Sequence, residues 1–168
     1  MMHVNFLAVL VAALIPMIIG FIWYNPKVLG TAWMKAADMS MEKMKGANMG
    51  LVFGLTFVFS FFVAMTMNFV TIHQWGVFSS LATDPKALAD PTSPIGAYFA
   101  DFMAKYGNNF RTFKHGALHG TVSGFMFILP VIAVNAMFER KGFKYIAINA
   151  GFWIVCLALM GGVICGWQ

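Results

Sequence analysis

The chain has 168 residues, of which 60% are hydrophobic and only 10% are charged. Soluble domains carry about 25% charged residues, so this composition excludes an ordinary soluble protein. The formal net charge of +5 does not indicate nucleic-acid binding, because the basic residues lie near the ends of apolar segments, where they anchor and orient membrane spans. We therefore expect a single membrane domain that covers residues 1–168.

Four long apolar segments contain no Asp, Glu, Lys or Arg, and they cover residues 5–24, 49–73, 116–138 and 145–167. A helix rises about 1.5 Å per residue, so each segment can cross a hydrocarbon core of about 30 Å. Unpaired backbone groups in lipid are costly, and spanning segments of this kind are therefore helical. The predicted fold class is all-α, an integral membrane bundle of four transmembrane helices within the lipid bilayer.

The first apolar segment, residues 5–24, ends in two aromatic residues that are typical of a membrane interface. Its amino end has no Lys or Arg and no cleavage site follows it, which favours a retained helix over a cleavable signal peptide. Asn25 and Pro26 then break the helix, because the residue before proline is displaced from the helical region. Residues 31–45 are predicted to form a short helix near the interface.

The long connection between the second and third apolar segments is predicted to contain an amphipathic helix at residues 95–106. Apolar residues recur there at helical spacing, while Asp101 and Lys105 fall on the opposite face as an i, i+4 pair. We expect this helix to lie on the outer surface or to form a lid over the bundle. The alternative is an ordered surface loop.

The distribution of basic residues predicts the orientation. The connections at residues 25–48 and 139–144 together carry seven of the eleven lysines and arginines. Short basic loops remain in the cytoplasm, so both termini and the long connection at residues 74–115 are predicted to lie outside.

Prolines and asparagines interrupt the apolar segments. Pro16 and Pro130 each remove a backbone hydrogen bond and are expected to bend their helices. Asn135 and Asn149 flank the short connection between the last two spans, and we expect them to hydrogen-bond across it.

Glycines recur every four residues on three of the four apolar segments. This spacing lets membrane helices approach closely, so it predicts a tightly packed bundle. It does not distinguish contacts within one chain from contacts between chains. The predicted packing positions are Gly116, Gly120, Gly124, Gly50, Gly54, Gly162 and Gly166.

Two stretches carry a family resemblance. Residues 23–33, WYNPKVLGTAW, resemble the signature of the DUF1761 family of small bacterial inner-membrane proteins. Residues 135–167, NAMFERKGFKYIAINAGFWIVCLALMGGVICGW, are similar to the family's phenylalanine-acidic-basic loop, its Asn-Ala-Gly helix and its Met-Gly-Gly ending. The resemblance leaves out the long connection. It implies four helices in a bacterial inner (plasma) membrane, and it implies no activity and no catalytic residue.

All four histidines fall at the predicted outer end of the bundle. His115 and His119 are spaced i, i+4, so they share a helix face and can present two imidazoles to one metal ion. A third ligand would come from His73, or alternatively from His3 or Asp101. Imidazole suits zinc, copper, nickel and haem iron. The alternative is that the histidines are ordinary interface residues, since histidine is amphipathic.

The sequence contains no nucleophile–base arrangement, phosphate loop or carboxylate pair, so we expect no enzymatic activity. The favoured function is that of a homo-oligomer or an accessory subunit of a larger membrane assembly. A small channel or transporter is the alternative, with polar residues of the second and third helices facing water. The third hypothesis is a component that binds zinc, copper or haem through His73, His115 and His119; otherwise no cofactor is expected.

Overall fold

The computed structural model describes residues 2–167, and every regular element in that range is a helix. Four helical segments are long and apolar enough to cross a membrane. They confirm the predicted membrane bundle, with boundaries within a few residues of those expected. The four spans are α1 (Phe6–Trp23), α4 (Met49–Thr71), a third span (Phe113–Phe138) and α10 (Phe143–Gly166).

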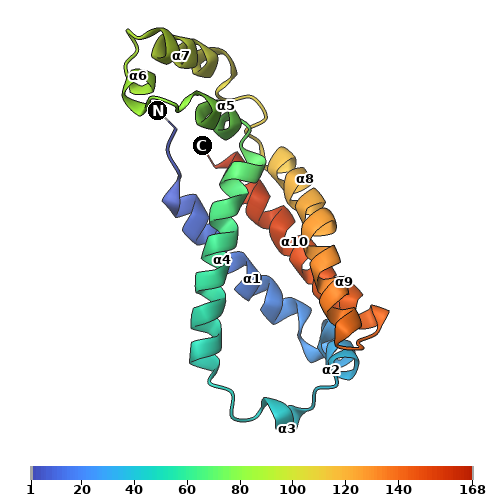
Figure 1. The fold of residues 1–168 in the computed structure, drawn as a ribbon. Coiled ribbons are helices and arrows are strands. Elements are labelled where there is room, and N and C mark those ends of the chain that lie inside the picture. Colours follow the sequence, from blue (N-terminus) through green and yellow to red (C-terminus); the bar gives the residue numbers. More distant parts are fainter. Residues whose placement is uncertain (1, 168) are drawn as a thin grey trace.

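The last helix, α10, lies at the centre of the bundle and contacts the other three spans (Figure 1). More than half of its most apolar stretch is buried, whereas about a tenth of the corresponding stretch of α4 is buried, 56% against 11%. Small residues of α1, including Ala12 and Ala13, face the core that Cys156 and Met160 of α10 complete. The outer faces of α1, α4 and the third span carry exposed apolar side chains, as lipid contact requires.

The third span is interrupted near its middle. It consists of α8 (Phe113–Ser123), a π-helical turn η2 (Gly124–Ile128) and α9 (Leu129–Phe138). Pro130 has no N–H to donate to the preceding turn, and the π-helical turn lies directly before it. The interruption expected at this proline thus takes the form of a widened turn, while Pro16 lies buried inside a continuous α1.

Glycines join α8 to α10. A Cβ atom at Gly116 would overlap the carbonyl oxygen of Gly161, and one at Gly120 would overlap that of Leu157. Gly124 lies against Ile154 in the same way. The predicted glycine face of the third span therefore packs within the chain.

The other predicted glycines divide into two groups. Gly162 lies against the ring of Phe113 and Gly166 against its backbone, so both are packed. Gly54 has open space where a Cβ would stand, and Gly50 meets only the side chain of Asn48. The expectation that Gly50 and Gly54 pack in the bundle is therefore wrong for contacts within this chain, because residues 49–55 at the start of α4 are all exposed.

The connection after α1 contains three short helices in place of the single helix expected at residues 31–45. The chain leaves α2 through Asp38, whose φ of 56° is left-handed and ends the helix. The three elements are the π-helical η1 (Pro26–Gly30), α2 (Thr31–Ala37) and α3 (Met41–Met44).

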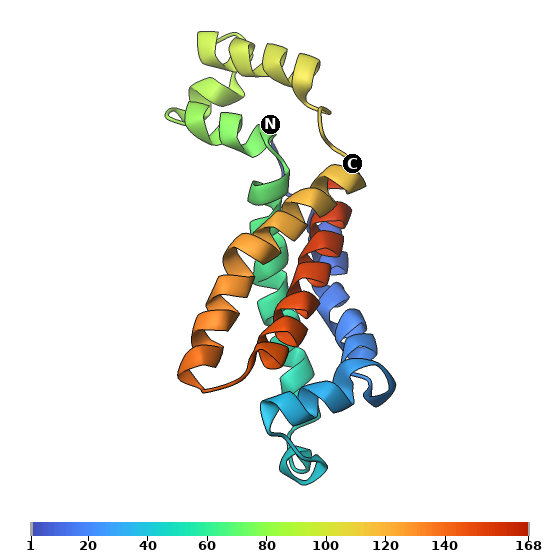
Figure 2. The same ribbon diagram turned by 90° about the vertical axis from the view of Figure 1, so that its right-hand side faces the viewer.

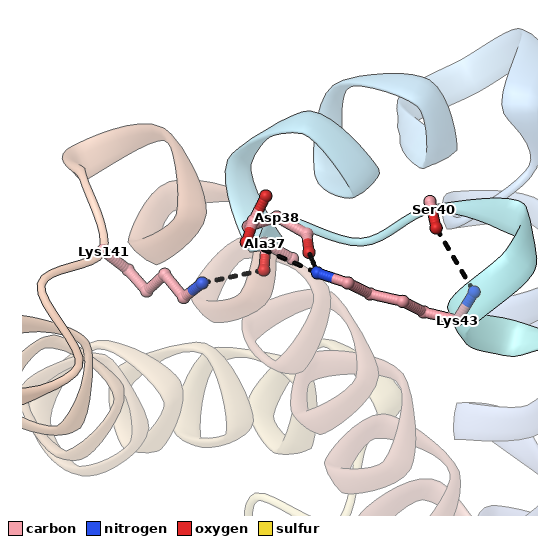
Figure 3. A network of polar contacts seen from close by, with 5 residues as sticks. All are labelled: Ala37, Asp38, Ser40, Lys43 and Lys141. Carbon is pink, nitrogen blue, oxygen red and sulfur yellow. Dashed lines mark hydrogen bonds and ion pairs between the residues drawn. The ribbon is translucent and has the colours of Figure 1, made fainter.

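The two basic connections meet at one end of the bundle (Figure 3). Lys141 Nζ donates a hydrogen bond to the carbonyl oxygen of Ala37 at 2.8 Å, and Lys43 Nζ donates to that of Asp38 at 2.9 Å. Lysines near the end of a helix favourably contact its unpaired carbonyls. Both basic loops therefore lie on the same side, and both chain ends lie at the opposite end (Figure 1).

Between the second and third spans the chain builds a small helical cap, which we define as residues 74–106. Figure 2 shows it beyond the end of the bundle, with α7 outermost. Phe99 of α7 is buried and contacts Phe78 of α5, while Asp101 and Lys105 form an exposed pair at 2.8 Å. This confirms the predicted amphipathic helix. The cap consists of α5 (Gln74–Leu81), α6 (Pro85–Ala89) and α7 (Pro94–Tyr106).

Hydrogen bonds connect the two ends of the cap where the cap meets the bundle. Gln74 Nε2 donates hydrogen bonds to the carbonyl oxygens of Tyr106 at 2.9 Å and Asn109 at 3.0 Å. The start of α5 is therefore held against the end of α7, and the residues on either side of the cap come close together.

Candidate metal centre

Three histidines converge where the cap joins the bundle. Each of His73, His115 and His119 offers a ring nitrogen, and these nitrogens all lie within 4.8 Å of one another. His73 stands between α4 and α5, whereas His115 and His119 occupy successive turns of α8 with ring centroids 4.5 Å apart. The structure thus places together the three residues whose sequence pattern predicted a metal site.

Local backbone features position these side chains. Ile72 is extended after the last turn of α4, which turns the chain so that His73 starts a new helix. The Thr112 side chain accepts a hydrogen bond from the backbone N–H of His115 at 3.2 Å and caps α8. Phe110, with a left-handed φ of 62°, places its ring 5.0 Å from that of His115.

The separations of the ligand nitrogens include one of 2.9 Å and reach at most 4.8 Å, so they lie on both sides of the spacing that a shared metal ion requires. The Nε2 atoms of His73 and His115 are 2.9 Å apart. Two imidazoles on one tetrahedral zinc, each at about 2.0–2.1 Å, would have nitrogens about 3.4 Å apart. Small rotations of the two rings would therefore allow both nitrogens to coordinate one ion. His73 is exposed and the other two are half-buried, so an ion can reach the cluster from solution.

The two alternative third ligands do not join the cluster. Asp101 pairs with Lys105 on the far side of the cap, and His3 is exposed in the segment before α1. Within residues 2–167, His73, His115 and His119 form the one group of three metal-ligating side chains. The donor set is entirely imidazole, which suits zinc and copper.

The spacing of the nitrogens favours a bare ion over haem. Axial haem ligands approach the iron from opposite faces of a broad planar ring. Nitrogens 2.9 Å apart leave no room for such a ring between His73 and His115. Three ring nitrogens within 4.8 Å of one another suit a single ion with one coordination position left open.

A second polar cluster lies at the opposite end of the bundle, around Asn149. Its Oδ1 accepts hydrogen bonds from the Tyr24 hydroxyl at 3.1 Å and from Trp33 Nε1 at 3.2 Å. Trp23 Nε1 donates to the carbonyl oxygen of Ile148 at 3.1 Å. These contacts hold the end of α1 and the segment after it against α10. The cluster around Asn149 therefore has a structural role.

The predicted partnership of Asn149 with Asn135 is not formed. The Asn149 amide nitrogen donates to the carbonyl oxygen of Tyr145 at 2.8 Å, and its oxygen is taken by the two aromatic donors. Asn135 is exposed on α9. Aromatic residues from the end of α1 and the connection after it reach Asn149 because α2 folds back against α10.

Comparison with known families places the chain in a family. The family described as a protein of unknown function, DUF1761, matches residues 7–165, which is nearly the whole chain. The chain belongs to the DUF1761 family. The match confirms the resemblance seen at residues 23–33 and 135–167, and it extends across the cap. Comparison with curated proteins and with solved structures gave no match.

In this DUF1761 protein, the stretch at residues 23–33 that resembles the family signature supplies hydrogen bonds to α10. Trp23, Tyr24 and Trp33 supply the three donors around Asn149 and Ile148. A side chain at Gly30, between them, would overlap the carbonyl oxygen of Tyr24. The stretch therefore packs against α10, at the end of the bundle remote from the histidines.

Two contributors to the histidine cluster of this DUF1761 protein were not predicted from the sequence. Cys165 Sγ donates to the carbonyl oxygens of Thr71 at 3.4 Å and Phe110 at 3.3 Å, which joins the segments that carry the histidines. Phe110 packs against the His115 ring. Neither residue belongs to a periodic pattern, because each acts through a contact across the bundle.

Proposed function

We propose that this protein is a non-enzymatic, multi-pass membrane protein that binds one transition-metal ion, foremost zinc, through His73, His115 and His119. The observation that supports the proposal is the convergence of three ring nitrogens within 4.8 Å. Two of the ligands lie 42 residues apart in the chain, so a shared helix face alone does not account for the cluster.

The chemistry of the cluster fits this proposal. Neutral imidazole is a good ligand for zinc and copper, and three imidazoles with an open fourth position form a common zinc arrangement. The tight contacts of Cys165 and Phe110 hold the ligand-bearing segments in place. Access from solution is given by the exposed His73.

The proposed setting is a bacterial inner membrane, with the histidines and both chain ends on the outer side. The seven basic residues in the connections at the other end support this orientation through the positive-inside rule. The oligomer or accessory-subunit role stays a prediction. The glycines of α8 lend it no support, because they are used in packing against α10 within the chain.

Elemental analysis tests the proposal directly. We expect the protein, purified in an uncharged detergent without chelator, to carry about one zinc or copper ion per chain. His119→Ala should remove the ion, because two imidazoles hold it too weakly, whereas His3→Ala should retain it. An ion content that is equal in the two variants, or a chain that takes up no added Zn²⁺, would overturn the proposal.

A further inference from the structure

A groove on the lipid-facing side of the bundle lies between α4 and the third span. Its volume is about 340 Å³, and its walls are formed by Val63, Thr66, Val70, Ser123 and Phe127, with Leu157 of α10 behind them. The side chains of Thr66 and Phe127 are exposed, and in Figure 1 the two wall helices separate from each other away from the cap. The groove is therefore open to the hydrocarbon of the bilayer.

The surface of the groove suits a hydrocarbon chain. Its two hydroxyl groups are already committed, because Thr66 donates to the carbonyl oxygen of Phe62 at 3.0 Å and Ser123 donates to that of His119 at 2.8 Å. The remaining walls are apolar. A polar ligand body would find no available donor along this groove.

The groove continues the face of the third span that carries His115 and His119. On the third span His115, His119, Ser123 and Phe127 follow one another at intervals of four residues, which places them along one face. On α4, Thr66 and Val70 lie four residues apart, and His73 follows just beyond the end of this helix. A helix rises about 1.5 Å per residue, so Phe127 lies about 12 Å below His119.

The π-helical turn is part of this groove. Phe127 and Ile128 belong to η2, the widened turn before Pro130. Widened turns inside helices frequently occur at functional sites, and this one shapes the wall directly below the histidines. It is an observation independent of the metal cluster.

The depth of the two sites matches the two ends of a phospholipid. α4 ends at Thr71 and α8 begins at Phe113, so the histidines lie at the level where the apolar spans end. Lipid phosphates occupy this interfacial layer, and acyl chains lie below it. A phosphate oxygen is also an accepted ligand for a zinc ion with an open coordination position.

We propose that the groove binds one acyl chain of a phosphate-headed membrane lipid, whose phosphate oxygen occupies the fourth coordination position of the ion held by His73, His115 and His119. The proposal rests on the proposed metal site. It gives that site a ligand class, an anionic lipid taken from the bilayer.

Cobalt provides a visible probe of the coordination sphere. The full chain in dodecyl maltoside is loaded with Co²⁺ and titrated with dodecyl phosphate or with inorganic phosphate. We expect dodecyl phosphate to change the visible spectrum of the bound cobalt at concentrations at least about tenfold lower than inorganic phosphate, because chain burial adds free energy that the free anion lacks.

Groove-filling variants separate the groove from the metal. Thr66→Trp should leave cobalt binding unchanged and weaken the response to dodecyl phosphate about tenfold. Thr56→Trp is the matched control, since Thr56 lies on the same helix and donates its hydroxyl to the carbonyl four residues back, at 2.8 Å, outside the groove lining. Val63→Trp, about 15 Å along α4 from His73, should repeat the loss seen with Thr66→Trp.

The outcomes distinguish the two proposals. If the wild-type chain binds no cobalt, the metal site fails, and the lipid proposal fails with it. If cobalt binds but inorganic phosphate and dodecyl phosphate act at the same concentration, the metal site stands and the lipid proposal is overturned. An unchanged dodecyl phosphate response in both Thr66→Trp and Val63→Trp would overturn it as well.

Discussion

His73 Nε2 and His115 Nε2 lie 2.9 Å apart, although 42 residues separate them in the chain. Most of the intervening residues build the cap, so this contact closes the cap at its base. The hydrogen bonds of Gln74 to Tyr106 and Asn109 close it a second time. An ion bound between the histidines would therefore stabilise the cap and the ends of two membrane spans together.

Zinc should raise the melting temperature of the purified protein. A ligand at about 100 times its dissociation constant adds about 2.7 kcal/mol to the stability of the state that binds it. His73→Ala should lose this gain while His3→Ala keeps it, as measured by thermal unfolding in detergent. An equal gain in His73→Ala would show that zinc binds elsewhere.

The crossing of α8 and α10 should not tolerate added volume. Gly120→Leu would place a side chain against the backbone of Leu157 and Ala158, and overpacking of this kind costs about 1–3 kcal/mol or more. We expect lower expression and a lower melting temperature than wild type. Gly142→Ala is the control, since nothing lies within 4 Å of a Cβ at that position. Equal behaviour of the two variants would contradict the close contact.

The sequence was sufficient to predict the spans because their apolar character is a local property of each segment. Charge-free stretches of this length are confined to helices by the lipid, whatever their neighbours. The histidine set was predictable for a related reason. His115 and His119 share a face through helix periodicity, and His73 falls at the same end once the spans are known.

Contacts between helices were not predictable in the same way. The glycine spacing at Gly50 and Gly54 equals that at Gly116 and Gly120, yet only the second pair meets another helix of the chain. Likewise Asn149 finds aromatic donors from the segment after α1. Periodicity identifies a face, whereas the partner of that face depends on how the whole bundle is arranged.

Asn149 should be required for the end of the bundle remote from the histidines. Asn149→Leu removes the acceptor of Tyr24 and Trp33, and the loss of such hydrogen bonds costs about 1–2 kcal/mol. We expect a lower melting temperature and a shift of tryptophan fluorescence to longer wavelength as Trp33 becomes more exposed. Asn135→Leu, on an exposed face of α9, should leave both properties unchanged. A stable Asn149→Leu with wild-type fluorescence would show that the cluster contributes no stability.

The orientation of the bundle can be tested by labelling single cysteines in intact cells. Thr92 lies exposed in the cap and Ser40 lies exposed in the basic connection at the other end, so cysteine at either position is accessible to solvent. The native Cys156 and Cys165 are buried, and they are first replaced by alanine and serine respectively, so that position 165 keeps a hydrogen-bond donor.

The positive-inside rule predicts that Thr92→Cys reacts with a membrane-impermeant maleimide in intact cells, whereas Ser40→Cys reacts only after permeabilisation. The hydrogen bond from Lys141 to the carbonyl oxygen of Ala37 places both basic connections on one side of the membrane. Labelling of either connection should therefore give the same orientation. The reverse labelling pattern would move the histidine cluster to the cytoplasmic side. The ion would then come from the cytoplasm, and the lipid phosphate would come from the inner leaflet.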